Sequence, residues 1–427
     1  MNKAVVILAG VGIGALAIGG VAVAQGGGSG GTAVYWMTAD TMSGMGGMMG
    51  GAMGGGGKPS GRAMLGAMMG RGGGFNPNGY SKMLHLQLGS NARPAGEPTA
   101  EHLVPQGLQV GPSLPLVTPH ATPTTPTTET TEWPTQMEKP RGRILIYWGC
   151  GDHARPGQPA IIDFASIQAG NLPPAFANLA RYHGEMPPGP GRFATYGDWP
   201  NQKNSTRVPE GGSLVGDHVI HGNYSPEIRF TLAAGQDFLA PVTLVSNSKS
   251  PVGSVPVQWQ PVPGARAWLA TAMGGGQNGD MVIWTSSETQ AYAMAMDYLP
   301  DGEIARLVQQ RVLMPGSTDR CTVPAEVVSA GQSMMYMLTA LGGEANFSHP
   351  VRPARAPASW HPDWVVKLRT KSSYTGLLGM NMSEMMGGRS ADQGQDQQGD
   401  QGQGDQGKKK KKKGLFGGIG GLIPHPR

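Results

Sequence analysis

The chain has 427 residues, contains 69 Gly and 36 Pro, and carries a formal net charge of +5. Residues 391–427 hold four Asp, six Lys and one Arg, a net charge of +3, so only +2 remains for the rest of the chain. Residues 1–390 therefore carry too little positive charge to form a basic surface for nucleic acid, and nucleic acid is not the expected partner.

The first 24 residues have the pattern of a cleavable secretion signal. Lys3 precedes an apolar run from Ala4 to Val23, which ends in the small residues that signal peptidase accepts, Ala22-Val23-Ala24. The alternative is an uncleaved membrane anchor, because about 20 apolar residues can just span a bilayer. Five glycines weaken such a helix, and polar, glycine-rich sequence follows it. We therefore expect an exported protein, in the periplasm or at the cell surface, with no transmembrane span after cleavage.

Residues 25–80 form a glycine- and methionine-rich arm. Glycine at this density costs too much backbone entropy for a stable helix or strand, which predicts a flexible segment. Within it, the run 33–37 has the composition of a short strand that docks on a globular body. Residues 81–140 are expected to be a partly ordered approach, with a strand at 83–88, followed by a Pro/Thr linker.

A β-rich globular body is predicted over 141–370, as one unit or as two subdomains, 141–224 and 225–370. Short β-prone runs separated by turn-forming residues are typical of a sandwich or barrel. The predicted strands are 143–148 and 159–164 (paired as a hairpin), 214–220, 227–232, 242–245, 255–260, 267–272, 280–285, 291–296, 322–328, 333–341 and 364–369. One helix is predicted at 303–312, one or two short helices at 166–183, and a long loop at 184–212.

One stretch of this body resembles a known family. Residues 257–269, VQWQPVPGARAWL, are similar to the pattern W-x-P-V-x-G-A-x-x-Y of bacterial fibronectin type III domains, with Trp268 in place of the Tyr. In that family the Trp ends one core strand and the aromatic residue opens the next. The resemblance implies an all-β, immunoglobulin/fibronectin-like sandwich body with one or two short inserted helices and long disordered N- and C-terminal arms. It implies no function, because such sandwiches have many roles.

Methionines in the N-terminal arm give the first candidate site. Met42, Met45, Met48 and Met49 place thioether groups at close spacing. Thioether sulfur is a soft ligand that suits Cu(I), and it does not protonate in an acidic compartment. The pattern predicts periplasmic Cu(I) binding as one alternative function. The other explanation is that these are adaptable apolar side chains in a low-complexity arm.

The two cysteines, Cys150 and Cys321, permit one disulfide in an exported protein. A metal site is the alternative, because Cys150 and His153 from one segment and His218 and His221 from another have the residue types and spacing of a tetrahedral site. His218 and His221 lie in an alternating segment, however, and would face opposite sides of a strand. Polar loops with hydrogen-bonded histidines are the simpler explanation of the same residues.

Catalytic patterns are incomplete. The sequence contains no nucleophile elbow, no P-loop and no dinucleotide fingerprint. A non-enzymatic role is therefore expected, and a hydrolase with an unrecognised site is kept as a further alternative.

The C-terminal end combines a low-complexity linker, 371–407, with a basic and apolar tail, 408–427. Six lysines attract an anionic surface at about 1 kcal/mol each near a charged leaflet, and the segment GLFGGIGGLI behind them resembles glycine-rich fusion peptides. Polybasic charge beside a short apolar anchor is typical of peripheral membrane contact. The residues expected to make this contact are Lys408, Lys409, Lys410, Lys411, Lys412, Lys413, Leu415, Phe416 and Ile419.

These observations predict an exported binding or structural protein of the bacterial cell envelope. Its tail is expected to contact an anionic surface, which is lipid, lipopolysaccharide or another polymer, or an envelope protein.

Overall fold

The computed structural model describes residues 32–47, 79–119, 142–163, 182, 184–290, 299–357 and 359–380, all of which belong to one compact unit, Met1–Met385. The predicted signal, the Pro/Thr linker and the C-terminal tail lie outside the described residues. The predicted strand 291–296 lies outside them too, as does nearly all of the helical region predicted at 166–183.

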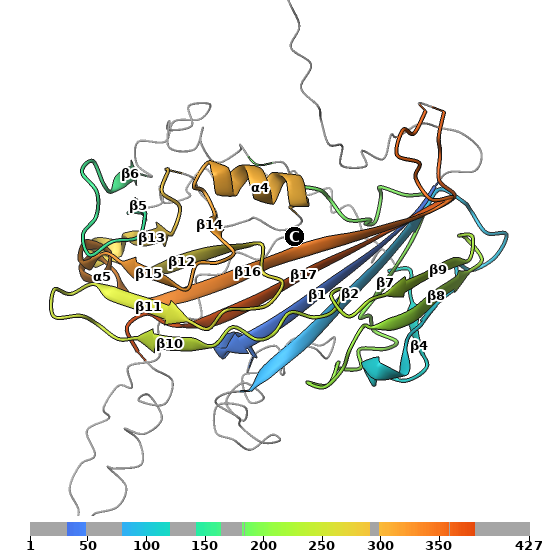
Figure 1. The fold of residues 1–427 in the computed structure, drawn as a ribbon, viewed down its shortest axis with the longest axis horizontal. Coiled ribbons are helices and arrows are strands. Elements are labelled where there is room, and N and C mark those ends of the chain that lie inside the picture. Colours follow the sequence, from blue (N-terminus) through green and yellow to red (C-terminus); the bar gives the residue numbers. More distant parts are fainter. Residues whose placement is uncertain are drawn as a thin grey trace, which may run out of the picture. The chain divides into compact units, whose positions relative to one another are not determined.

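Most of the described chain is β-structure, as the sequence predicts (Figure 1). The described strands form one sheet of ten strands, one of three and one of four. The ten-stranded sheet, called the central sheet below, runs in the order β6 (Ala160–Asp163), β5 (Arg143–Trp148), β13 (Met281–Thr285), β12 (Ala267–Gly275), β16 (Gln332–His349), β17 (Trp364–Leu377), β1 (Ala33–Gly44), β2 (Tyr80–Ser90) and β7 (Thr195–Trp199). The two-residue β14 (Met314–Pro315) pairs with β12.

The two smaller sheets come from separate parts of the chain. One consists of β10 (Leu244–Asn247), β11 (Val255–Trp259) and β15 (Arg320–Val323). The other has the order β4 (Ser113–Leu116), β3 (Ala100–Leu103), β8 (Gly216–Gly222) and β9 (Ile228–Leu232). The described helices are short: α4 (Asp301–Gln309), α5 (Ala325–Ala330), and the 3-10 turns η1 (Gln106–Leu108) and η3 (Gln277–Gly279).

The three-stranded sheet packs on the central sheet around buried tryptophans. Trp259 of β11 and Trp268 of β12 are each at most 1% exposed, and their rings lie 5.2 Å apart. Apolar residues of β11 and β15 alternate inward and meet those of β12, β13 and β16 in this first core. Five large aromatic side chains are buried in this core, and their removal from water supplies much of the local driving force for folding.

The four-stranded sheet packs on the other half of the central sheet. Its residues and those of β1, β2 and β7 form a second core, which includes Tyr35, Leu86 and Phe230. The long strand β16 serves both cores, because Leu338 belongs to the first core and Ala345 to the second, with a β-bulge between Leu341 and Glu344. The two cores are therefore joined by continuous strands rather than by a linker.

The face of the central sheet that bears these two cores is called its inner face. Alternate residues of each strand point to the opposite, outer face. Helix α4 covers part of that outer face, where Ile304 and Leu307 pack with Leu269 of β12 and Leu341 of β16. This helix was predicted at 303–312, and it begins two residues earlier.

Several sequence predictions can be compared with these strands. The hairpin of 143–148 and 159–164 is confirmed, because β5 and β6 pair antiparallel. The strand predicted at 322–328 ends at Val323 instead, because Pro324, which has no N–H to donate, opens α5. The loop predicted at 184–212 contains β7, which pairs with β2.

Strands β1 and β2 lie well inside the central sheet. The sequence predicts a short docking strand at 33–37 in a flexible arm, whereas β1 runs for 12 residues between β17 and β2. Residues 41–44 include polar and glycine positions that local propensity does not favour in a strand. Hydrogen bonding to neighbours on both sides decides the conformation there.

Candidate ligand-binding site

A row of charged and aromatic side chains crosses the outer face of the central sheet. The strand register sets Trp36 of β1 opposite Lys367 of β17, and Lys367 opposite Asn346 of β16. One step along, Arg369 lies opposite Glu344. Because directly paired residues point to the same face, these five side chains gather on one patch, behind which the second core fills the inner face.

Four charges of this patch form an ion-pair network. Arg369 Nη2 lies 2.5 Å from Glu185 Oε2 and 3.0 Å from Glu344 Oε2. Lys367 Nζ lies 3.7 Å from Glu344 Oε2 and also contacts Glu185. The side chains of both cations are only 10% exposed, and burial lowers the pKa of Arg369 while the two carboxylates oppose that shift.

Trp36, on the neighbouring strand, contacts both cations of the network. The Lys367 ammonium and the Arg369 guanidinium each lie 5.3 Å from the centre of its ring. A cation over the face of an indole ring is stabilised by the ring quadrupole, more strongly where water is excluded. The network thereby holds two positive groups in fixed positions beside an aromatic wall.

A cavity of about 480 Å³ opens over this patch. This volume lies in the range of small-molecule sites. Its wall is formed by the sheet, by the segment 184–193 before β7, and by the segment 346–360 that connects β16 to β17. The lining residues used below are Trp36, Arg192, Phe193, Arg352, Trp360 and Lys367.

The segment 184–193 is fastened to the outer face by polar contacts. Gln87 Nε2 of β2 donates a hydrogen bond to the Pro188 carbonyl at 2.8 Å. Arg192 Nη1 donates to the Pro187 carbonyl at 2.5 Å, which curls the segment back on itself. The Phe193 ring then lies against the sheet over Gly89. A residue with a Cβ at position 89 would occupy the space that this ring takes.

We expect Gly89→Ala to loosen this wall. A Cβ on Gly89 would lie 2.5 Å from the Phe193 ring, so the ring and its segment must shift. Overpacking of this kind costs about 1–3 kcal/mol of the free energy of unfolding, which chemical denaturation measures. Gly96→Ala is the matched control, because a Cβ there meets no atom within 4 Å. Equal effects of the two substitutions would contradict the packing described.

The segment between β16 and β17 adds an arginine over a tryptophan to the cavity lining. The Arg352 guanidinium lies 5.6 Å from the centre of the Trp360 ring. The indole nitrogen of Trp360 is buried and has no hydrogen-bond partner among the described residues. An unpaired buried donor is costly, and it marks the place where a bound acceptor would be favourable.

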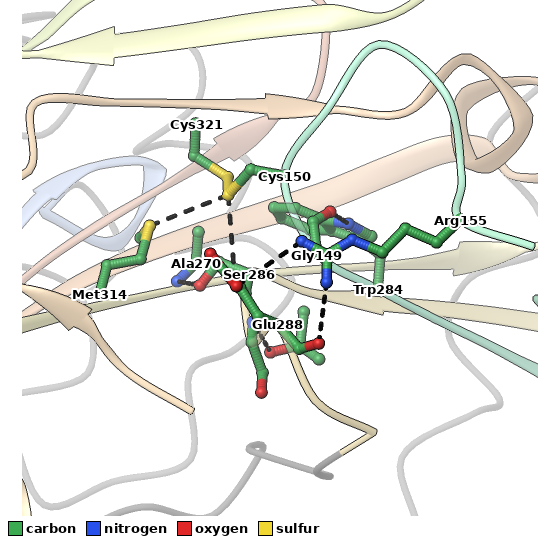
Figure 2. The surroundings of a disulfide bond; sticks show 11 residues. Gly149, Cys150, Arg155, Ala270, Trp284, Ser286, Glu288, Met314 and Cys321 are labelled. Carbon is green, nitrogen blue, oxygen red and sulfur yellow. Dashed lines mark hydrogen bonds and ion pairs between the residues drawn. A yellow bond between two sulfur atoms is a disulfide. The ribbon is translucent and has the colours of Figure 1, made fainter. Parts of the chain in front are cut away.

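The residues singled out from the sequence lie elsewhere. Cys150, which follows β5, and Cys321 of β15 form a disulfide (Figure 2). The bridge lies against Ser286 and Met314, each 4.0 Å from the sulfur of Cys150, and the nearby indole of Trp284 donates to the Gly149 carbonyl at 2.9 Å. A disulfide-bonded sulfur has no thiolate to offer, so Cys150 is no metal ligand in this form.

The three histidines of the predicted metal site each have a separate partner. His153 Nδ1 lies 3.0 Å from Glu326, and His221 Nδ1 lies 3.0 Å from Glu227. His218 points into the second core instead, on the face of β8 opposite to His221. Within the described part of the chain, no group of three or more His, Cys, Asp or Glu side chains could hold a metal ion.

His218 belongs to a buried chain of hydrogen bonds that the sequence did not indicate. His102 Nε2 lies 2.9 Å from His218 Nδ1, and His102 Nδ1 lies 2.8 Å from the Tyr35 hydroxyl. The three side chains are fully buried, and His218 Nε2 lies 2.7 Å from the Leu214 carbonyl. Burial lowers the pKa of both histidines, with the Leu214 carbonyl and Asp217 partly opposing the shift at His218.

Of the four methionines predicted to bind Cu(I), Met42 and Met45 lie within the described residues. Met42 is on the outer face of β1, opposite Ser81 of β2 and Ser373 of β17. Met48 and Met49 lie outside the described residues, as do Lys408–Lys413, Leu415, Phe416 and Ile419.

The site residues on β17 have a recognisable pattern in the sequence. Lys367 and Arg369 alternate with the apolar residues Val366 and Leu368, which are buried on the other face of the strand. Two cations at alternate positions of an otherwise apolar run, 364–369, need partners on one face, which is the signal of a polar patch. Glu185 and Trp36, by contrast, come from distant segments and no local pattern joins them to β17.

No helix among the described residues has the length and apolar character needed to cross a bilayer. Comparison with protein-family models, with curated proteins and with solved structures finds no match for this chain.

Proposed function

We propose that this chain is an exported envelope protein that binds an anionic sugar polymer in the cavity on the outer face of its central sheet. The observation that carries the proposal is the composition of that cavity, which has a volume of about 480 Å³. It has aromatic walls, three cationic side chains and one indole N–H without a hydrogen-bond partner among the described residues. The disulfide is consistent with the oxidising compartment that export would reach.

The aromatic walls suit a flat ring with apolar faces. Trp36, Phe193 and Trp360 all line the cavity. A sugar ring presents C–H groups that are slightly positive, and they pack favourably against the negative face of an aromatic ring. The ring hydroxyls offer acceptors to the Trp360 indole and to the Asn346 amide, which also lines the cavity.

The cations specify a negative charge on that ring. Arg192, Arg352 and Lys367 line the cavity, against the single carboxylate of Glu185, which is already engaged by Lys367 and Arg369. Arginine binds carboxylates through two parallel hydrogen bonds, which adds direction as well as charge. A uronic acid unit combines both requirements in one residue of a polymer.

Arg352→Gln tests the site. We expect the variant to bind an oligomer of uronic acid about 10- to 100-fold more weakly than the parent, because a charge-assisted hydrogen bond is lost. Quenching of tryptophan fluorescence gives the affinity. The control is Arg355→Gln, which removes a cation from the same segment outside the cavity lining.

Two results would contradict the proposal. One is equal affinity of the two arginine variants. The other is equally tight binding of the methyl-esterified, uncharged oligomer. A chain that ends at residue 407 should keep the affinity of the parent, because the tail is proposed to contact an anionic envelope surface independently of the cavity.

We further propose that residues 244–377 form a fibronectin type III-like sandwich. Strands β10, β11 and β15 lie on one side of the first core, and β13, β12, β16 and β17 lie on the other. Seven strands arranged as three over four, with the chain passing from sheet to sheet, are typical of immunoglobulin-like sandwiches. The stretch 257–269 supports this, because Trp259 ends β11 and Trp268 lies at the start of β12.

A further inference from the structure

Three exposed methionines lie together on the outer face of the central sheet, away from the proposed sugar site. They are Met273 of β12 and Met335 and Met337 of β16, with exposed fractions of 40%, 45% and 40%. Both strands are internal in the sheet, where each has a hydrogen-bonded neighbour on either side. Three methionines in contact with solvent on two interior strands need an explanation, since methionine is usually buried.

The strand register brings the three thioethers within reach of one point. Met273 is paired directly with Met335, so their Cβ atoms are about 5 Å apart. Met337 follows Met335 on the same face, about 7 Å further along the strand. Each methionine side chain has three rotatable bonds, so the sulfur atoms can converge above the sheet without moving the backbone.

The surroundings leave this place open. Gly275 is the next outward residue on β12 after Met273, and a Cβ built there would meet no atom within 4 Å. On the other side, Met337 is paired with Thr375 of β17, a small polar residue against which Gly46 packs. The side of Gly275 thus leaves room for an ion, and the paired neighbours bring no acidic side chain that would favour a hard cation instead.

We propose that Met273, Met335 and Met337 form a binding site for a soft monovalent metal ion, Cu(I). Thioether sulfur is a soft donor that prefers Cu(I) to the hard divalent ions, and three such donors suit its low coordination number. The site is built on rigid strands, so the donors are held near one another before the ion arrives. It is separate from the methionines predicted from the N-terminal arm, because Met42 lies on β1 and β17 lies between β1 and β16.

Cu(I) transfer from bicinchoninate, in ascorbate and without thiols, tests the site on the full chain. We expect Met335→Leu to weaken Cu(I) binding at least about tenfold, because even indirect changes around a metal site cost that much. Met83→Leu is the matched control: Met83 is 39% exposed and lies on the same face of the sheet, on β2. Leucine keeps the volume and apolar character, so both variants should fold.

Labelled methionine methyl groups give a second reading with Ag(I), a soft ion that does not change oxidation state. The methyl resonances of Met273, Met335 and Met337 should be the first to shift. The proposal is overturned if the first shifts belong to Met42, Met45 and the other methionines of the arm. Equal Cu(I) affinities of Met335→Leu and Met83→Leu, or no uptake by the parent chain, would overturn it as well.

Discussion

Replacing both cysteines by alanine, as Cys150→Ala/Cys321→Ala, should lower the free energy of unfolding by up to about 5 kcal/mol. The bridge spans a sequence separation of 171 residues. In the chain-entropy description, a crosslink restricts the unfolded chain more as the loop it closes becomes longer, and a loop of this length lies at the upper end of the range. Alanine is chosen because Cys321 is 3% exposed and packs in the first core.

The native contacts around the bridge decide how much of this effect is realised. Cys150 lies in the turn after β5, and the same turn is fastened to β15 and α5 by other bonds. Gly151 N–H donates to the Thr322 carbonyl at 2.9 Å, and Ala154 N–H donates to Glu326 at 2.7 Å. These bonds hold the turn in place without the disulfide, so the fold itself should be retained and the loss should come from the unfolded state.

Guanidinium denaturation of the oxidised parent, the reduced parent and the double variant measures the effect. The reduced parent and the variant should unfold at similar denaturant concentrations, well below that of the oxidised parent. A Cys150→Ala/Cys321→Ala variant as stable as the oxidised parent would show that the bridge does not crosslink two distant segments of the native fold.

The stability of the chain should fall as the pH is lowered below about 6.5, because of His102 and His218. Burial depresses the pKa of both histidines in the folded chain. Between their ordinary pKa, about 6.5, and the lower folded values, the unfolded chain binds protons that the folded chain does not. The free energy of unfolding then decreases by about 1.4 kcal/mol per pH unit for each histidine. The contribution of the two neutral histidines to the free energy of unfolding is fully present above this pH window and is lost as the pH falls through it.

Together with burial, the hydrogen-bond chain explains why both histidines cannot be protonated in the folded chain. The Leu214 carbonyl can only accept, so His218 Nε2 carries the hydrogen and, in the neutral ring, Nδ1 accepts from His102 Nε2. His102 Nδ1 must then accept from the Tyr35 hydroxyl. One added proton can be accommodated by reversing these bonds, but a second would set two N–H groups against each other in a core where charge is already costly.

Unfolding by urea between pH 8 and pH 5 tests this account. The His102→Gln and His218→Gln variants, separately and together, should show a shallower pH dependence than the parent, even where their stability at pH 8 is lower. His221→Gln is the control on the same strand, since His221 faces solvent near Glu227. A parent-like slope in the His102→Gln/His218→Gln variant would assign the pH dependence to other groups.

Local pattern predicted the strands of the body well, but of their pairings it predicted only the hairpin of β5 and β6. The runs 143–148 and 280–285 match β5 and β13 closely, because both are apolar, β-branched and bounded by turn formers. Nothing in those runs tells that β5 and β13 pair in parallel. Pairing depends on which distant segment buries the same apolar surface, and single-sequence periodicity carries no such information.

The candidate site shows the same limit more strongly. The disulfide partners were the two cysteines available, so composition alone was enough to name them. The cavity draws Trp36, Glu185 and Arg352 from three segments that composition places in an arm, a loop and the end of the body. Such a site exists only after the strands have assembled. In the sequence, only the cations at alternate positions of β17 indicate it.

The parallel pairing of β1 with β17 also determines when the central sheet can be completed during folding. Ala33 is paired with Trp364, so one of the first strands to be synthesised finds its neighbour only when nearly the whole chain is available. Contacts of such high contact order form late and slowly, and until then β1 and β2 leave an open sheet edge. A chain that is threaded unfolded through a membrane and folds on the far side has no need of an early, self-sufficient N-terminal half. The proposed export and the topology of the central sheet are thus compatible: the unfolded chain would cross the membrane first, and β1 would pair with β17 afterwards.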